Sequence, residues 1–268
     1  MKSLTILIAS LFVGLLSFNT YAASVDGSID RGEYQWNTNG AEGSDKWETF
    51  SRGGRAYHEY NDASGGDSWD INFLGTNVAD GKYQFGAIGG QILSGLKTGS
   101  SWTSGQAIYL SDFAISVNNF TNPTVDSSGF DYAIRLLGVN DKTGEAEFAL
   151  LTGGTWESAD IYGSRYGDKH KTETYKMGDD ATTITTFTGK WSNNGGDDNV
   201  LEGEFDLSFL SLFDPSTGGT LSTYLTMACV NDEALVHADI AAVPVPAAIW
   251  LFAPALAGFM GLRRRKTA

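Results

Sequence analysis

The stretch KYQFGAI, residues 82–88, alternates large apolar side chains with polar or small ones. Tyr83, Phe85 and Ala87 fall on one side of an extended chain, because successive side chains of a β-strand point to opposite faces. The turn residues ADGK, residues 79–82, come directly before it. The pattern predicts a half-buried strand of an antiparallel sheet whose aromatic side chains face the core.

Stretches with the same period of two recur on both sides of this strand, separated by clusters of Gly, Asn, Asp and Ser. No long amphipathic helical pattern interrupts them, and one short helix is expected from Ser208 to Phe213. The side chains expected to share a face within each stretch are Trp69, Ile71 and Phe73; Phe113, Ile115 and Val117; Phe130, Tyr132, Ile134 and Leu136; Phe187 and Trp191; Leu201, Phe205 and Leu207; and Leu221, Leu225, Met227 and Cys229.

Many short strands at this spacing predict an all-β fold, an antiparallel two-sheet sandwich that is most simply a jelly roll. No repeat of 20–50 residues is present, which argues against a propeller or a β-helix. The region holds only Pro123 and Pro215, so one domain is expected over residues 23–242. Cys229 is the single cysteine, which excludes an intramolecular disulfide framework and a multi-cysteine zinc site.

The amino-terminal end has the pattern of a secretory signal peptide. Lys2 precedes the apolar run LTILIASLFVGLLSF, and the small residues of TYAAS follow. Cleavage after Ala22 would put Thr20 at the −3 position, whereas cleavage after Ala23 would put the bulky Tyr21 there. The sequence therefore predicts a signal peptide over residues 1–22, and a permanent amino-terminal anchor is the alternative.

The carboxyl-terminal end combines a proline motif, an apolar span and a basic tail in VPVPAAIWLFAPALAGFMGLRRRKTA, residues 243–268. The uncharged residues 243–262 would span about 30 Å as a helix, roughly one bilayer core. Arg263, Arg264 and Arg265, followed by Lys266, would hold that end on the cytoplasmic side. A plain membrane anchor would show the same span and tail.

The order of these three features resembles the PEP-CTERM sorting signals, specifically the VPLPA-CTERM variant. Val243, Pro244, Val245, Pro246 and Ala247 stand where that family has its VPLPA motif, with Val245 in place of leucine. The resemblance covers the last 26 residues. It implies a Gram-negative bacterium, transient anchoring in the inner membrane, and cleavage near the motif by an exosortase-type transpeptidase. Release to the cell surface or to an exopolysaccharide matrix would follow.

The domain between the two ends is strongly acidic. It holds 13 Lys and Arg against 32 Asp and Glu, a formal net charge of −19. Such a charge repels nucleic acid and anionic lipid, so nucleic-acid binding is excluded, and it favours divalent cations. DGSIDRGEY, residues 26–34, and the later order of strands weakly resemble family-9-type carbohydrate-binding and DOMON-like β-sandwiches, a resemblance that implies a glycan ligand.

Three groups of side chains are candidates for chemistry within the domain. Glu202, Glu204 and Asp206 alternate on one expected strand, as the acids of jelly-roll glycosidases do, although a solvent-facing strand surface predicts the same alternation. Oxygen-bearing side chains at near-alternate positions in a turn suit calcium. Those calcium candidates are Asp26, Ser28, Asp30 and Glu33.

Exposed indoles would suit sugar stacking, and four of the tryptophans lie among small polar residues or beside a loop. These glycan-binding candidates are Trp36, Trp47, Trp102 and Trp156. The function that the sequence favours is therefore an exported, non-catalytic, glycan-associated β-sandwich. The alternatives are an extracellular jelly-roll glycoside hydrolase or lyase that uses the three acids, and a purely structural surface protein.

Overall fold

The computed structural model describes residues 22–30, 33–34, 50–52, 55–57, 71–97, 108–118, 129–158, 174–196, 198–228 and 233–242. Within these ranges most residues lie in β-strands and almost none in helices, which confirms the all-β prediction. Two 3-10 turns are the helical elements of the described residues, η5 (Gln91–Ser94) and η8 (Leu207–Phe209).

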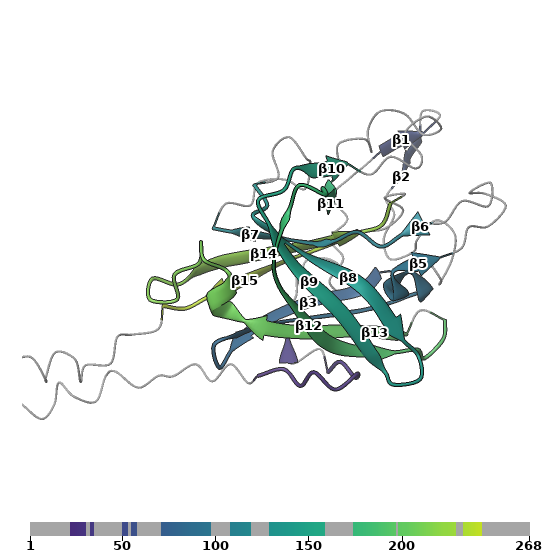
Figure 1. Ribbon diagram of the computed structural model, residues 1–268. Coiled ribbons are helices and arrows are strands. Elements are labelled where there is room, and N and C mark those ends of the chain that lie inside the picture. Colours follow the sequence, from purple (N-terminus) through teal and green to yellow (C-terminus); the bar gives the residue numbers. More distant parts are fainter. Residues whose placement is uncertain are drawn as a thin grey trace, which may run out of the picture.

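One antiparallel sheet contains nine of the strands, and each strand pairs with its neighbours in antiparallel register (Figure 1). Three two-stranded sheets, β1–β2, β5–β6 and β10–β11, accompany it. In spatial order the nine strands are β15 (Glu233–Ile240), β14 (Gly219–Thr226), β7 (Phe113–Val117), β8 (Tyr132–Asn140), β9 (Glu145–Thr152), β12 (Thr182–Ser192), β13 (Asn199–Asp206), β4 (Lys82–Gly89) and β3 (Ile71–Ala79). The shorter strands are β1 (Phe50–Arg52), β2 (Arg55–Tyr57), β5 (Leu96–Lys97), β6 (Ile108–Tyr109), β10 (Trp156–Ser158) and β11 (Thr174–Met177).

The nine-stranded sheet curls on itself, so that β15 and β3, the two ends of the strand order, lie beside each other. The accumulated twist of neighbouring strands favours such curling in a long sheet. The result is sandwich-like, with a core enclosed by one continuous sheet. The two-sheet jelly roll is therefore not confirmed among the described strands, because alternation predicts which side chains face inward but not which strands pair.

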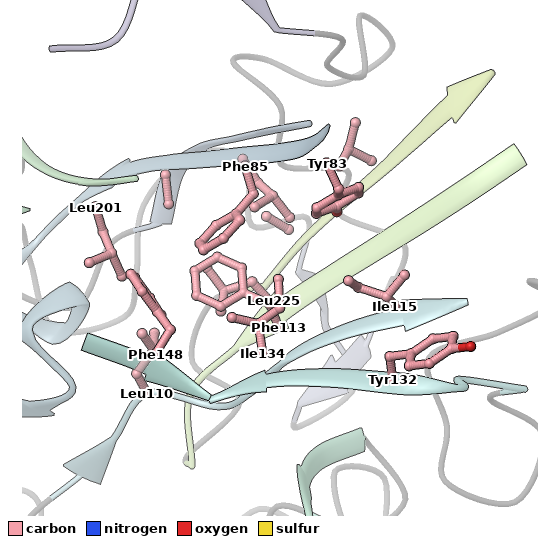
Figure 2. Packing of buried hydrophobic residues seen from close by; sticks show 14 of the residues in the cluster. Tyr83, Phe85, Leu110, Phe113, Ile115, Tyr132, Ile134, Phe148, Leu201 and Leu225 are labelled. Atoms are coloured by element: carbon pink, nitrogen blue, oxygen red, sulfur yellow. The ribbon is translucent and has the colours of Figure 1, made fainter. Parts of the chain in front are cut away.

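The enclosed core is rich in aromatic side chains. The ring of Phe85 lies 4.9 Å from that of Phe113 and 5.2 Å from that of Phe148, measured between centroids. Figure 2 shows Tyr83 and Phe85 on β4 pointing toward side chains of the opposite wall, among them Ile134. Burying each such ring is worth roughly 1.5–3 kcal/mol, so this cluster is the main stabilising feature of the fold.

Most predicted inward-facing sets are confirmed, including Trp191 with Phe187. Two predictions are wrong. Phe73 faces outward while Ile71 faces inward, because the register of β3 shifts between these two residues, and an extra residue reverses the alternation. Phe130 precedes β8 and packs outside the sheet on Tyr224, with ring centroids 6.0 Å apart.

Short turns close the two ends of the core. At one end η5 inserts Ile92 and Leu93, which are both fully buried. At the other end the chain after η8 buries Leu210. The helix expected from Ser208 to Phe213 is only the 3-10 turn η8, because Asp206 caps it and the chain leaves helical geometry at Leu210.

Two short segments cover parts of the outer face. The amino-terminal segment, residues 22–30 and 33–34, packs Tyr34 and Ala23 on the outward-facing Phe73 (Figure 1, dark purple). The β10–β11 ribbon packs Trp156 and Met177 on small outward-facing side chains of β8 and β9. Side chains that alternation assigns to solvent are therefore buried in both places.

Candidate functional site

The carboxylates of β13 and the acidic residues of the amino-terminal segment meet on the outer face of the sheet. Glu202, Glu204 and Asp206 all point away from the core, as their alternation with Leu201 and Phe205 predicted. Their exposure differs sharply, however. Glu202 is completely buried, Glu204 is half-buried and Asp206 is exposed. The expectation that all three face solvent is wrong for Glu202.

Glu202 is buried because glycines on the neighbouring strands let the amino-terminal segment approach the sheet. Gly86 pairs with Glu202 on one side and with Gly75 on the other. A Cβ atom on Gly86 would lie 2.8 Å from Cδ1 of Ile29 and 3.1 Å from Cζ of Tyr34. Two adjacent residues without side chains thus make the space that the Tyr34 ring fills.

Both oxygens of Glu202 bind the amino-terminal segment. The Tyr34 hydroxyl donates to Oε1 at 2.8 Å, and the backbone N–H of Gly27 donates to Oε2 at 2.8 Å. The hydroxyl of Ser192 in turn donates to the Gly27 carbonyl at 2.7 Å. Gly27 has a φ of +93°, a backbone conformation that favours glycine. These bonds tie residues 22–34 to β12 and β13.

Burial raises the pKa of Glu202, although the hydrogen bonds from Tyr34 and Gly27 oppose that change. Burial, followed by the charge of Glu202, raises the pKa of the Tyr34 hydroxyl. A raised carboxyl pKa in a cleft suggests a general acid. Here both oxygens accept hydrogen bonds from the protein and no surface is exposed, so this carboxyl holds a chain segment rather than facing a substrate.

Glu204 and Asp206 have separate partners. Glu204 forms an ion pair with Lys82 and accepts a hydrogen bond from Nε2 of Gln84 at 3.0 Å. Asp206 accepts the backbone N–H of Ser208 at 2.9 Å and caps η8, and its contacts with Ser208 lower its pKa. The structure therefore distributes the three candidate catalytic acids over three sets of contacts instead of gathering them around one reacting position.

The calcium candidates, Asp26, Ser28, Asp30 and Glu33, lie in the amino-terminal segment. Asp26 accepts hydrogen bonds from the Ser24 hydroxyl at 3.1 Å and from the backbone N–H of Ser28 at 2.9 Å. The backbone N–H of Glu33 closes a turn on the Asp30 carbonyl at 2.9 Å. No three His, Cys, Asp or Glu side chains of the described ranges are grouped to hold a metal ion. The calcium hypothesis gains no support from this geometry.

Trp156 is the one glycan-binding candidate within the described ranges. Its Nε1 donates to the Phe130 carbonyl at 2.9 Å, and its ring lies 5.9 Å from that of Phe130. The indole thus anchors β10 on the outer face and is half-buried. Trp36, Trp47 and Trp102 lie outside the described residues.

The residues predicted for sorting also lie outside the described ranges; they are Val243, Pro244, Val245, Pro246, Ala247, Arg263, Arg264 and Arg265. So does nearly all of the predicted signal peptide, since the described chain begins at Ala22. The helical turns that the structure does describe are all too short to cross a bilayer.

Sequence reasoning missed one polar contact on this face, the pairing of Gln84 with the backbone of Ala23. Gln84 is 2% exposed, although its place in KYQFGAI predicts a solvent-facing side chain. The sequence marks Gln84 only as a polar residue between two core aromatics. That pattern is common to half-buried strands, so it does not indicate the contact with Ala23.

Comparison with known proteins gives no relative. No protein-family model matches the chain, and neither the curated proteins nor the solved structures contain a match.

Proposed function

We propose that this chain is an exported surface or extracellular-matrix protein that is sorted through a PEP-CTERM-type signal. A signal peptidase removes the leader, the span at residues 243–262 holds the chain in the inner membrane, and an exosortase-type transpeptidase cuts near residues 243–247. The sandwich-like domain then acts as a non-catalytic component associated with exopolysaccharide.

The position of the fold between the two processing segments carries this proposal. The strands that the structure describes, β1 to β15, all lie within residues 23–242, the mature domain that the sequence predicts. β15 ends at Ile240, three residues before the proline motif begins at Val243. Proteolytic removal of either end would thus leave every described strand intact, which is what a processed precursor requires.

The way the chain leaves the last strand also supports the proposal. Gly219 pairs with Ile240, so β15 is held to its final residue. A Cβ atom on Gly218 would lie 2.4 Å from the Ile240 carbonyl oxygen and 2.6 Å from the Ala242 nitrogen, so the departing chain runs closely along Gly218. Ala241 and Ala242, the last two described residues before the motif, are exposed at the surface of the domain.

The sorting step is tested by expressing the full chain in an exosortase-positive, exopolysaccharide-producing host. The wild-type protein is expected to lose its carboxyl-terminal segment and to be released from the inner membrane. The double variant Pro244→Ala, Pro246→Ala is expected to keep that segment and to stay in the membrane fraction. Pro215→Ala, a proline substitution in the turn before β14, is the control that should be processed normally. Equal size and equal release of the double variant would contradict the proposal.

The glycan step is tested by sedimenting the exported protein with purified exopolysaccharide of the same host. Trp36→Ala, Trp47→Ala and Trp102→Ala together are expected to reduce the bound fraction at least several-fold, because each stacked indole contributes a large apolar contact area. Phe209→Ala removes an aromatic side chain that is 38% exposed on η8 and serves as the control. Binding that the triple variant retains in full would contradict the assignment of these three indoles, and a wild-type protein that does not bind would favour the purely structural alternative.

A further inference from the structure

The side chain of Gln84 binds both backbone groups of Ala23, the N–H and the carbonyl. The N–H of Ala23 donates to Oε1 of Gln84 at 2.9 Å, and Nε2 of Gln84 donates to the Ala23 carbonyl at 2.7 Å. The side-chain amide thus pairs with Ala23 as a neighbouring strand would. Ala23 is itself only 5% exposed and packs with Tyr34 and Phe73.

The remaining bonding capacity of Gln84 is directed to residues of the sheet. Its second amide proton goes to Oε2 of Glu204 at 3.0 Å, and its oxygen also receives Nδ2 of Asn77 at 3.4 Å. Loss of Ala23 would remove the two shortest of these four bonds from an amide that has almost no access to water. Leaving buried polar groups without partners is destabilising.

The two cleavage points that the leader allows have different consequences for this contact. A cut after Ala22 removes an exposed residue and preserves both bonds of Ala23. A cut after Ala23 removes a buried residue. The new terminus would then be Ser24, which is exposed and whose nitrogen lies 3.2 Å from Oε2 of Glu33, and an exposed ion pair contributes little.

We infer that the signal peptide is cut between Ala22 and Ala23, and that the new α-ammonium of Ala23 is a structural group of the mature fold, bound by Oε1 of Gln84. Hydrolysis breaks the Ala22 C–Ala23 N bond, the water oxygen becomes the second oxygen of the leader carboxylate, and both water protons go to the released amine, which becomes an ammonium. The nitrogen that donated one amide proton becomes a charged donor, and the Gln84 amide links it to Glu204 through two hydrogen bonds. This inference rests on the export step of the proposed function.

Charge makes the mature contact stronger than the precursor contact. A charged donor forms shorter and stronger hydrogen bonds than a neutral amide does. Glu204 is the carboxylate that Gln84 binds, and its ion pair with Lys82 reduces the negative charge there without removing it. Processing thereby fastens the first residue of the mature chain to β4.

The amino terminus of the exported full-length protein is determined by mass spectrometry, and its thermal unfolding is measured. The wild-type chain is expected to begin at Ala23. Gln84→Ala is expected to be cut at the same bond and to melt on the order of 5 °C lower, because Ala23 loses both partners. Gln91→Ala, on an exposed glutamine of η5, is the control and should melt closer to the wild type than Gln84→Ala does.

A second variant keeps Gln84 and moves the cut. Tyr21→Ala puts a small residue at the −3 position for cleavage after Ala23, so chains that begin at Ser24 should be formed. These chains are expected to melt lower than chains that begin at Ala23, by about as much as Gln84→Ala does. A wild-type chain that begins at Ser24, or a Gln84→Ala variant that melts as the wild type does, would overturn the inference.

The outcome for the sorting signal is separate from the outcome at Ala23. A wild-type chain that begins at Ala23 but keeps its carboxyl-terminal segment would contradict exosortase processing and leave the Gln84 contact supported. A chain that is sorted normally but begins at Ser24 would support exosortase processing and contradict the inference about Ala23 and Gln84.

Discussion

Two segments cover the outer face of the same sheet, and each encloses a buried carboxylate. The amino-terminal segment, residues 22–34, closes over Glu202 at β4 and β13. The β10–β11 ribbon closes over Asp112, whose Oδ2 accepts the backbone N–H of Met177 at 2.8 Å. In Figure 1 the two segments lie on opposite sides of the molecule, each against the outer face of the curled sheet.

The two carboxylates have different partners. Nε and Nη2 of Arg135 donate to Oδ1 and Oδ2 of Asp112 at 2.9 and 2.8 Å, and Arg135 also donates to the Met177 carbonyl. Glu202 instead receives two neutral donors, the Tyr34 hydroxyl and the Gly27 amide. Burial raises the pKa of both carboxyls, and the strongest opposing influence is Arg135 for Asp112 and Tyr34 for Glu202.

A segment that covers the outer face of the sheet can be held there by a buried ion pair or by neutral hydrogen bonds. The two arrangements are destabilised by different changes. The ion pair fails as a unit when its cation is removed, since an isolated buried charge is very unfavourable. The neutral arrangement depends more on the space that glycines provide and on the protonation of one carboxyl.

Removal of the cation under the β10–β11 ribbon should have the largest effect. Arg135→Met leaves Asp112 buried and uncompensated, so the free energy of unfolding is expected to fall by about 3–5 kcal/mol. Urea denaturation measures this loss, and hydrogen exchange at β10 and β11 should increase. Adding Asp112→Asn to Arg135→Met is expected to recover much of the stability. A single variant as stable as the wild type would show that the ribbon does not depend on the ion pair.

Filling the glycine space under the amino-terminal segment should have a smaller effect. Gly86→Ala brings a methyl group into contact with Ile29 and Tyr34, and overpacking of this kind typically costs about 1–3 kcal/mol. Gly138→Ala is the control, because a Cβ atom there would meet nothing within 4 Å. Thermal unfolding of the two variants, together with protease sensitivity near Gly27, provides the measurement. Equal stability of both variants would show that the close approach at Gly86 is unimportant.

The pH dependence of stability that arises from Glu202 and its two neutral donors should be the smallest effect. The folded-state pKa of Glu202 is raised, so its contribution to stability is fully present below the unfolded pKa and is lost as pH rises through the folded pKa. Relative to Glu202→Gln, the wild type should therefore gain stability as pH falls from 7 toward 4, by less than about 1.4 kcal/mol per pH unit.

Denaturation curves of both proteins at several pH values test this direction. Relative to Asp206→Asn, the wild type should instead lose stability as pH falls, because contacts with Ser208 lower the folded-state pKa of Asp206. A stability difference between Glu202→Gln and the wild type that stays constant over this range would contradict the assigned pKa direction.

Alternation within single strands predicted much of the core. The inward positions of Phe85 on β4 and of Leu201 on β13 follow from the period of two alone. Phe73 was assigned to the wrong face because one shifted residue in β3 reverses that period, and nothing in the local sequence marks the shift. The pairing order of the nine strands was equally inaccessible, because it depends on contacts between distant stretches.

The candidate site was predictable only in its residue types. The three acids of β13 were correctly placed on the outward face, yet their environments depend on partners far away in the chain, such as Gly27 for Glu202. The role of Gln84 required the position of Ala23, 61 residues earlier.

The sequence by itself determined the class of fold, the alternation of most strands and the acidic charge of the domain, and it predicts the processing signals at its ends. These properties depend on composition and on neighbours within a few residues. Only the tertiary structure decided that one continuous sheet encloses the core, that Glu202 is buried and that Ala23 is bound by Gln84. The physical reason is that burial and hydrogen-bond pairing on the outer face are set by segments that meet only after the chain has folded.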